Sequence, residues 1–216
     1  MSTGVAGLAC GVVGLACGVA GSTCGVAGLT CGVAGLTCGV AEPAAGVVGH
    51  TGGMRIYLPA TLAMLREIDA DSAVGPAPLT GFAVTPALRE WYLDDDEEVL
   101  EYAAFTQAAR AALRLLDADP LAPRRRVVLS ADVPDHEVTL HPDLDRAVVR
   151  STVPIPLDRL ASVHVDGADA EPDVAAAAKV IMEADLGDED AQFTVDGTED
   201  HELEWYAVQE IPQLLS

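Results

Sequence analysis

The stretch MRIYLPATLAML, residues 54–65, decides the fold, because the character of the chain changes where it begins. Before it, residues 4–38 hold five copies of a seven-residue unit: GVAGLAC, GVVGLAC, GVAGSTC, GVAGLTC and GVAGLTC. After it, apolar residues recur at strand and helix spacings, and all nine aromatic residues of the chain lie there. The 163 residues of segment 54–216 suit one compact domain, preceded by the Gly/Cys-rich repeat segment 1–53.

The five cysteines of the chain all belong to the repeat and are seven residues apart. Zinc ligands come in short C-x₂₋₄-C pairs, which this spacing does not supply. On a helix the spacing separates consecutive cysteines by about 10.5 Å, which is too far for a disulfide bond. The repeat therefore predicts neither a metal site nor a local disulfide. Because residues 54–216 contain no cysteine, a thiol nucleophile in the domain is excluded.

Three interpretations of residues 1–53 remain open. The repeat copies differ by Ala/Thr, Ala/Val and Leu/Ser exchanges, which single base changes produce, so we favour an upstream DNA repeat read in frame, with translation starting at Met54. A disordered low-complexity tail is the second interpretation. A membrane span is the third, because GxxxG spacings recur. Against the span, no Lys or Arg precedes Arg55, and each glycine disfavours a helix by about 1 kcal/mol.

The domain is strongly acidic. The whole chain has a net charge of −22, and only Glu42 is charged before residue 54, so the domain carries −21. Such a charge repels phosphate backbones, and we expect no nucleic-acid partner. We expect the one basic cluster, residues 124–126, to form a solvated turn that pairs with carboxylates. An acidic surface suits a basic protein partner.

The absence of cysteine from the domain also bears on its location. Residues 54–216 cannot form the disulfide framework that is typical of small secreted domains. We therefore expect a cytoplasmic protein without membrane association.

Apolar periodicity and breaker residues predict alternating strands and helices in the domain. Strands are expected at residues 55–58, 79–84, 126–131, 147–153, 161–166 and 204–208. Helices are expected to start at Thr61, at Thr85-Pro86, after the acidic run 94–98 and at Pro172. This pattern indicates an α+β fold, in which helices pack on a mixed β-sheet in a single compact domain. Pro59 should end the first strand, and the helix after it implies a parallel crossover to the second strand.

Helical spacing also predicts which side chains face the core. The helix after the acidic run should bury Tyr102, Phe105, Ala109, Ala112, Leu113 and Leu116. The short helix before it should turn inward Leu88, Trp91 and Tyr92. The helix from Pro172 should bury Val174, Ala178, Ile181 and Met182 and end at Gly187. Residues 185–204 are expected to contain a solvated acidic loop.

The candidate site residues are His164, Asp166 and His201. His164 and Asp166 alternate on the expected strand, so their side chains should point to one face. A histidine near a carboxylate can act as a general base or a metal ligand. The alternative is a strand-end pair that faces solvent, or a capping Asp, and the position of His201 is not constrained.

No metal or cofactor is expected. The acidic stretch fails the spacing of a calcium loop, because the sixth residue from Asp196 is His201 and the twelfth is Ala207. The chain also contains no GxGxxG, P-loop, G-x-S-x-G or H-E-x-x-H motif.

Six segments carry a resemblance to a known family: MRIYLPATLAML, AVTPALREWY, EYAAFTQAAR, RRRVVLSADVPD, SVHVDGADAE and ELEWYAVQE. Residues 54–215 resemble an uncharacterised family of small actinobacterial proteins, a domain of unknown function. Proteins of that family start at the methionine that corresponds to Met54, and the repeat has no counterpart in them. The resemblance implies no reaction, ligand or catalytic residue.

Three hypotheses for function follow from the sequence. We favour a non-catalytic protein that acts through an interaction with a protein partner, because catalytic motifs are missing beside an acidic surface. The second hypothesis is an enzyme or small-ligand-binding protein whose site lies near His164 and Asp166. The third is the same domain tethered to a membrane by the glycine-rich segment. Whether the protein is an enzyme stays open at this point.

Overall fold

The structure is a computed structural model that describes residues 53–92 and 96–216. The three interpretations of the repeat segment therefore lie outside the described residues, except at Gly53. The first two acids of the run 94–98 also lie outside them. Among the described residues, no helix is long and apolar enough to cross a lipid bilayer.

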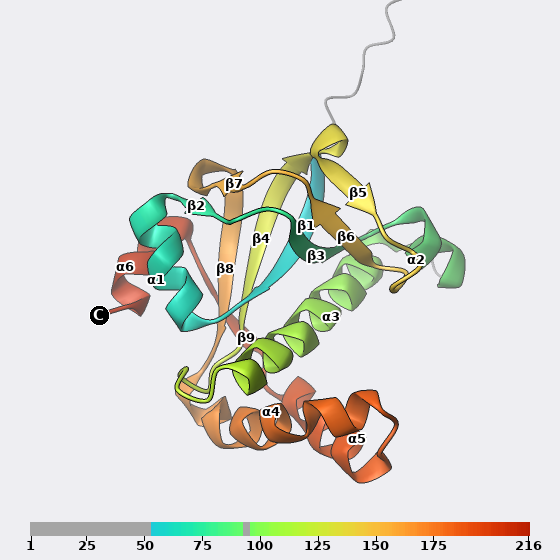
Figure 1. The fold of residues 1–216 in the computed structure, drawn as a ribbon, viewed down its shortest axis with the longest axis vertical. Coiled ribbons are helices and arrows are strands. Elements are labelled where there is room, and N and C mark those ends of the chain that lie inside the picture. The colour runs from blue at the N-terminus through green and yellow to red at the C-terminus, as the bar shows by residue number, and fades with distance from the viewer. Residues whose placement is uncertain (1–52, 93–95) are drawn as a thin grey trace, which may run out of the picture. The chain divides into compact units, whose positions relative to one another are not determined.

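A seven-stranded sheet forms the centre of the domain, with the strand order β5-β6-β3-β1-β4-β8-β9 (Figure 1). Its strands are β1 (Gly53–Ala60), β3 (Leu79–Ala83), β4 (Val127–Pro134), β5 (Val138–Leu140), β6 (Val148–Ser151), β8 (Leu160–Asp166) and β9 (Leu203–Tyr206). Every ladder of this sheet is antiparallel. A second, small sheet pairs β2 (Ala73–Val74) with β7 (Ile155–Pro156).

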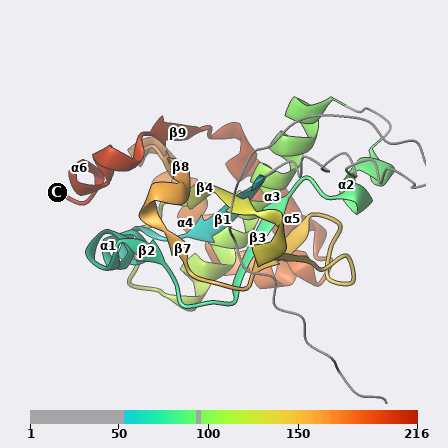
Figure 2. The same cartoon turned by 90° about the horizontal axis from the view of Figure 1, so that it is seen from above.

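Helices cover both faces of the sheet (Figures 1 and 2). They are α1 (Leu62–Asp71), α2 (Pro86–Trp91), α3 (Glu97–Ala118), α4 (Glu171–Asp185), α5 (Glu189–Asp196) and α6 (Ile211–Leu214). Helices α1 and α6 pack on one face, and α3 packs on the other through β1, β3 and β4. Helices α4 and α5 pack together, and α4 packs against α3. The expected α+β class with helices packed on a sheet is confirmed.

The two expected threonine caps are also confirmed. The hydroxyl of Thr61 accepts a hydrogen bond from the Met64 amide at 3.2 Å, and that of Thr85 accepts one from the Leu88 amide at 3.1 Å. Each bond satisfies an amide that has no partner inside the first turn of its helix. The starts of α1 and α2 were therefore readable from the sequence.

The expected parallel crossover from β1 to β3 is wrong, because these strands pair antiparallel. Between β1 and β3 the chain forms α1 and then β2, which pairs with β7, and it turns through residues 75–78. Strand β3 therefore runs alongside β1 in the opposite direction. The expected strand end at Pro59 is also wrong, since Pro59 pairs with Val128. Proline has no N–H to donate, and at this position β1 pairs only with β4, which makes the proline tolerable.

Some predicted core positions are exposed instead. Helix α3 buries Leu100, Ala104 and Ala108, whereas Tyr102 is 65% exposed. The Trp91 ring is 64% exposed, and the guanidinium of Arg146 lies 3.8 Å from its centroid. A cation over an aromatic face stabilises an exposed ring in this way. The buried stripe of α3 thus includes the predicted Ala109, Ala112, Leu113 and Leu116, but in the first half of the helix Leu100, Ala104 and Ala108 take the place of Tyr102.

Two corrections concern the last helices of the domain. Met182, which we expected on the buried side of α4, is exposed, and Ala177 and Ala184 are buried instead. The stretch expected as an acidic loop contains α5, whose N-terminus is capped by Asp188 through a 2.9 Å bond from the Ala191 amide. Acidic residues at the start of a helix interact favourably with its dipole, which explains how so acidic a stretch folds.

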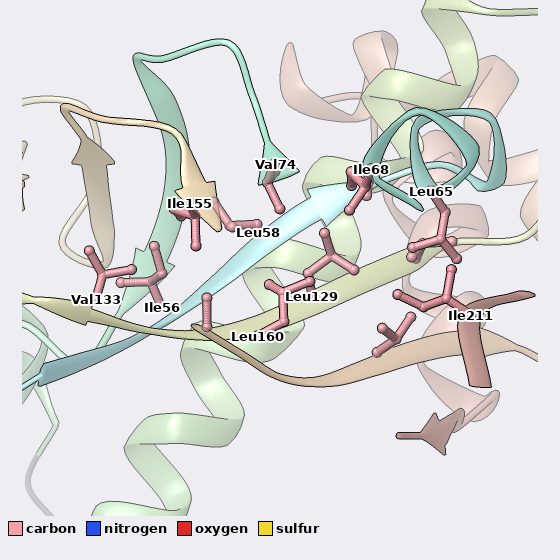
Figure 3. Close-up of a cluster of buried hydrophobic side chains, with 14 of the residues drawn as sticks. Ile56, Leu58, Leu65, Ile68, Val74, Leu129, Val133, Ile155, Leu160 and Ile211 are labelled. Atoms are coloured by element: carbon pink, nitrogen blue, oxygen red, sulfur yellow. The ribbon is translucent and has the colours of Figure 1, made fainter. Parts of the chain in front are cut away.

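The face of the sheet toward α1 and α6 holds the main apolar core. Alternate strand residues such as Ile56, Leu58 and Leu129 meet Leu65 of α1 and Ile211 of α6 (Figure 3). Their neighbours in the strands point to the opposite face, under α3. The site described below lies on that opposite face.

Candidate functional site

A cleft of about 520 Å³ opens on the α3 face of the sheet. The strands contribute its floor, which includes Tyr57, Ser130, Ser162 and His164. One side of α3 contributes Glu98, Glu101, Tyr102 and Phe105, spaced so that they share a helix face. The chain entering β9 supplies the other wall with Glu199, His201, Glu202, Leu203 and Trp205. The cleft therefore lies where α3 leaves the β8 and β9 end of the sheet uncovered.

A β-bulge in β8 sets which of its residues face the cleft. Ser130 pairs with Ser162, but the next residue of β4, Ala131, pairs with Leu160, so Ala161 is an extra residue. The bulge places Leu160 and Val163 in the same apolar core. Beyond the bulge, ordinary strand alternation points Ser162 and His164 together toward the cleft.

His164 is a half-buried residue of the cleft floor. Its Nε2 lies 3.0 Å from Ser162 Oγ, and its ring packs edge-on against Phe105 with centroids 4.9 Å apart. Burial lowers the pKa of His164 below its ordinary value of 6.5, because a low-polarity environment disfavours the imidazolium ion. The imidazole is therefore neutral at neutral pH and adds no positive charge to the cleft.

Asp166 is fully buried and holds Arg126. Its Oδ1 accepts from Arg126 Nη2 at 2.8 Å and its Oδ2 from Arg126 Nε at 2.9 Å. The guanidinium also donates to Thr198 Oγ1 and to the Thr198 and His201 carbonyls. The expectations that Arg126 lies in a solvated turn and that Asp166 faces solvent are therefore wrong. Antiparallel pairing of β4 and β8 brings the two ends together, and a buried arginine needs this carboxylate.

His201 lies in the wall opposite α3. Its Nε2 is 2.8 Å from Asp173 Oδ2, and its side chain lines the cleft. Of the three residues predicted from the sequence, the structure thus brings His164 and His201 to one cleft. Asp166 lies behind the wall, where it acts on the cleft only through Arg126.

Three floor residues, Tyr57, Ser130 and Ser162, were missed by sequence reasoning. Tyr57 is buried and packs edge-on against Phe105 at 5.7 Å between centroids. Burial and the nearby charge of Glu101 raise the pKa of Tyr57 to about 12, so the phenol stays protonated. Ser130 is 3% exposed and lines the cleft. A lone polar residue inside the apolar run RVVLSA was the available signal for Ser130.

The Ser130 hydroxyl is open to the cleft. Among the described residues it has no hydrogen-bond partner, yet no side-chain oxygen or nitrogen there is both fully enclosed and unpaired. The hydroxyl must therefore be reachable from the cleft. A polar group bound in the cleft could therefore form a hydrogen bond with this hydroxyl in place of water.

The charge of the cleft is negative. Within the described part of the chain, Glu98, Glu101, Glu199 and Glu202 form no salt bridge. Its two arginines are already paired: Arg55 with Asp132 at 2.9 Å, and Arg126 with Asp166. Glu101 interacts with the Tyr57 hydroxyl, so Glu98, Glu199 and Glu202 are the unpaired carboxylates of the rim among the described residues, while the neighbouring arginines are neutralised.

Metal binding finds no support in this arrangement. Within residues 53–92 and 96–216, no group of three or more His, Cys, Asp or Glu side chains is placed to hold a metal ion.

The fold and the cleft define an α+β protein in which a helix-covered antiparallel sheet carries an acidic, aromatic-walled cleft. The chain belongs to the family of unknown function DUF6912, whose family model matches residues 54–215. Membership in a domain family of unknown function, expected from the six segments, is therefore confirmed. Comparison with curated proteins and with solved structures gives no match.

Proposed function

We propose that the protein is a binding protein whose cleft accepts an organic cation, a primary ammonium or a guanidinium on an apolar stem. The observation that carries the proposal is the Ser130 hydroxyl, which has no hydrogen-bond partner among the described residues and lies at the floor of a cleft rimmed by four glutamates, of which Glu98, Glu199 and Glu202 are unpaired there. An ammonium or guanidinium group is rich in donors and has no acceptor, so it can donate to both.

Charge selects the sign of the ligand. The four rim glutamates attract a cation, and the paired Arg55 and Arg126 do not repel it strongly. Walls of low polarity strengthen the attraction at short range. An anion would meet unpaired carboxylates without a free guanidinium to receive it.

Shape and aromatic walls select the stem of the ligand. A volume of about 520 Å³ lies within the range of pockets for small ligands. Tyr102 and Trp205 are exposed at the rim, and Phe105 packs against Tyr57 and His164 of the floor. Aromatic faces bind an apolar stem by contact and a cation by its charge. Exposed aromatic rings beside a cleft thus fit the same ligand class.

A second candidate function is catalysis at Ser162 and His164. The 3.0 Å contact of Ser162 Oγ with His164 Nε2 is the arrangement of a nucleophile and its base. In such enzymes a third group orients the base, and among the described residues no carboxylate bonds to His164. Binding is therefore the better supported function. The catalytic alternative is tested by whether the protein hydrolyses p-nitrophenyl acetate, measured as release of p-nitrophenol.

The binding test compares three probes of similar shape: 3-phenylpropylamine, 4-phenylbutanol and 4-phenylbutyrate. Calorimetry on the full chain should show binding of the amine only, weakening as salt is added. Glu202→Gln and Glu98→Gln should each weaken it about twofold to fivefold.

The matched control is Glu183→Gln, which removes the same charge from an exposed position on α4 outside the cleft. It should leave amine binding unchanged. Equal binding of the anion, or an equal loss in Glu183→Gln, would show that the cleft does not select cations.

A further inference from the structure

The cleft is continuous with the free edge of the sheet. Strand β9 ends the strand order, and within the described residues it pairs only with β8 (Figure 2). The segment that leads into β9, with Glu202, and the strand itself, with Leu203 and Trp205, line the cleft. A molecule bound along the outer side of β9 would therefore pass the mouth of the cleft.

An unpaired strand edge offers backbone donors and acceptors to another extended chain. Strand β9 is short, and half of its N–H and C=O groups point away from β8. In such strand addition, the backbone bonds give affinity, and pockets for alternate side chains give specificity. Here the cleft is the pocket beside the edge, and its chemistry selects a basic side chain.

We infer that the partner is a protein segment that adds as a strand along β9 and inserts a Lys or Arg side chain into the cleft. This inference rests on the proposed cation binding and deepens it, since it names the source of the cation. The aliphatic part of Lys or Arg would pack against Trp205 and Phe105, while its charged end reaches the rim glutamates and Ser130.

Three molecules could pair with the free edge of β9: residues 1–52 of this chain, a second copy of the chain, or a different protein. The charges near the edge distinguish between them. Residues 1–52 of this chain contain no Lys or Arg, so no strand formed by them could insert a basic side chain into the cleft. A second copy of the chain, paired through β9, would bring its Glu202 and Glu204 against those of the first copy. Like charges placed across a strand pair are destabilising. A basic segment of a different protein is the occupant that the charges fit.

The test uses the peptide acetyl-Thr-Val-Arg-Val-Thr-amide and its Gln counterpart, measured by calorimetry on the full chain. We expect the Arg peptide to bind at least tenfold more tightly than 3-phenylpropylamine and than the Gln peptide. Two further Arg peptides carry N-methyl groups, one at odd and one at even positions. In one of these two peptides the methyl groups replace the N–H groups that face β9, and its affinity should decrease at least tenfold. The affinity of the other peptide, whose methyl groups point away from β9, should not decrease.

Hydrogen exchange gives an independent readout. The Arg peptide should slow exchange of amides in β9, and the small amine should not. If the amine binds but neither methylated peptide is weakened, or β9 amides exchange unchanged, strand addition is overturned and cation binding stands. If neither the amine nor the Arg peptide binds, both proposals fail.

Discussion

The two faces of the central sheet are built from the same strands and have opposite tasks. Toward α1 and α6, residues such as Ile56 and Leu129 are sealed in an apolar core. Toward α3, their neighbours Tyr57 and Ser130 line a cleft. A shift of one residue along a strand exchanges the two faces. One face therefore supplies stability, and the other is free to hold polar groups that bind.

The difference arises from how far the helices extend. Helix α3 packs on β1, β3 and β4, so the part of its face near β8 and β9 stays open. The apolar residues of the other face are covered by α1, by α6 and by the small sheet of β2 and β7. Polar groups on the α3 face are stable because most have partners, as the fully buried pair of Arg126 and Asp166 shows.

The largest expected effect breaks that buried pair. Asp166→Asn leaves the Arg126 guanidinium buried without a counter-ion and should lower the free energy of unfolding by about 3–5 kcal/mol. Urea denaturation measures it. The control is Asp132→Asn, which breaks the exposed pair with Arg55 on the same face and should cost no more than about 1 kcal/mol. Equal losses in the two variants would show that the cleft face does not depend on its buried ion pair.

A smaller effect separates two neighbours on β4. Leu129→Ala removes a fully buried side chain and should lower the free energy of unfolding by about 3 kcal/mol, without weakening amine binding in the folded protein. Ser130→Ala should change unfolding by less than about 0.5 kcal/mol. Because it removes an acceptor at the cleft floor, it should weaken 3-phenylpropylamine about threefold to tenfold. If Leu129→Ala weakened amine binding in calorimetry and Ser130→Ala lowered the free energy of unfolding in denaturation, the two faces would not have separate tasks.

The pH dependence of stability tests His164 on the cleft face. Burial keeps the pKa of His164 below 6.5 in the folded state. As the pH falls below 6.5, the unfolded chain binds a proton that the folded imidazole does not, so the free energy of unfolding decreases. His164→Gln should reduce this loss between pH 7.5 and 5.5. NMR titration of the imidazole checks the cause directly, and a pKa at or above 6.5 would contradict it.

The smallest effect is expected from removing the repeat. A chain starting at Met54 should melt within about 2 °C of the full chain, because the Gly, Ala, Val and Thr side chains of the repeat can bury little area. The two faces of the sheet would then suffice for the fold. A decrease of more than about 4 °C in calorimetric melting would show that residues before Met54 stabilise the domain.

The sequence alone determined the features that depend on near neighbours. The threonine caps of α1 and α2 were predicted because a cap and its amide are three residues apart. The strands were located by short-range apolar patterns, and the family segments marked the extent of the domain at residues 54–215. His164 and His201 were named as candidates, and both line the cleft.

Only the tertiary structure decided which distant residues meet. Arg126 was predicted to be solvated, because nothing near it in the sequence reveals Asp166, forty positions away. The strand order, the bulge at Ala161 and the exposure of Tyr102 likewise follow from how strands and helices pack. The cleft is a product of these long-range contacts. A local pattern fixes the face on which a side chain lies, whereas the partner that covers that face comes from a distant part of the chain.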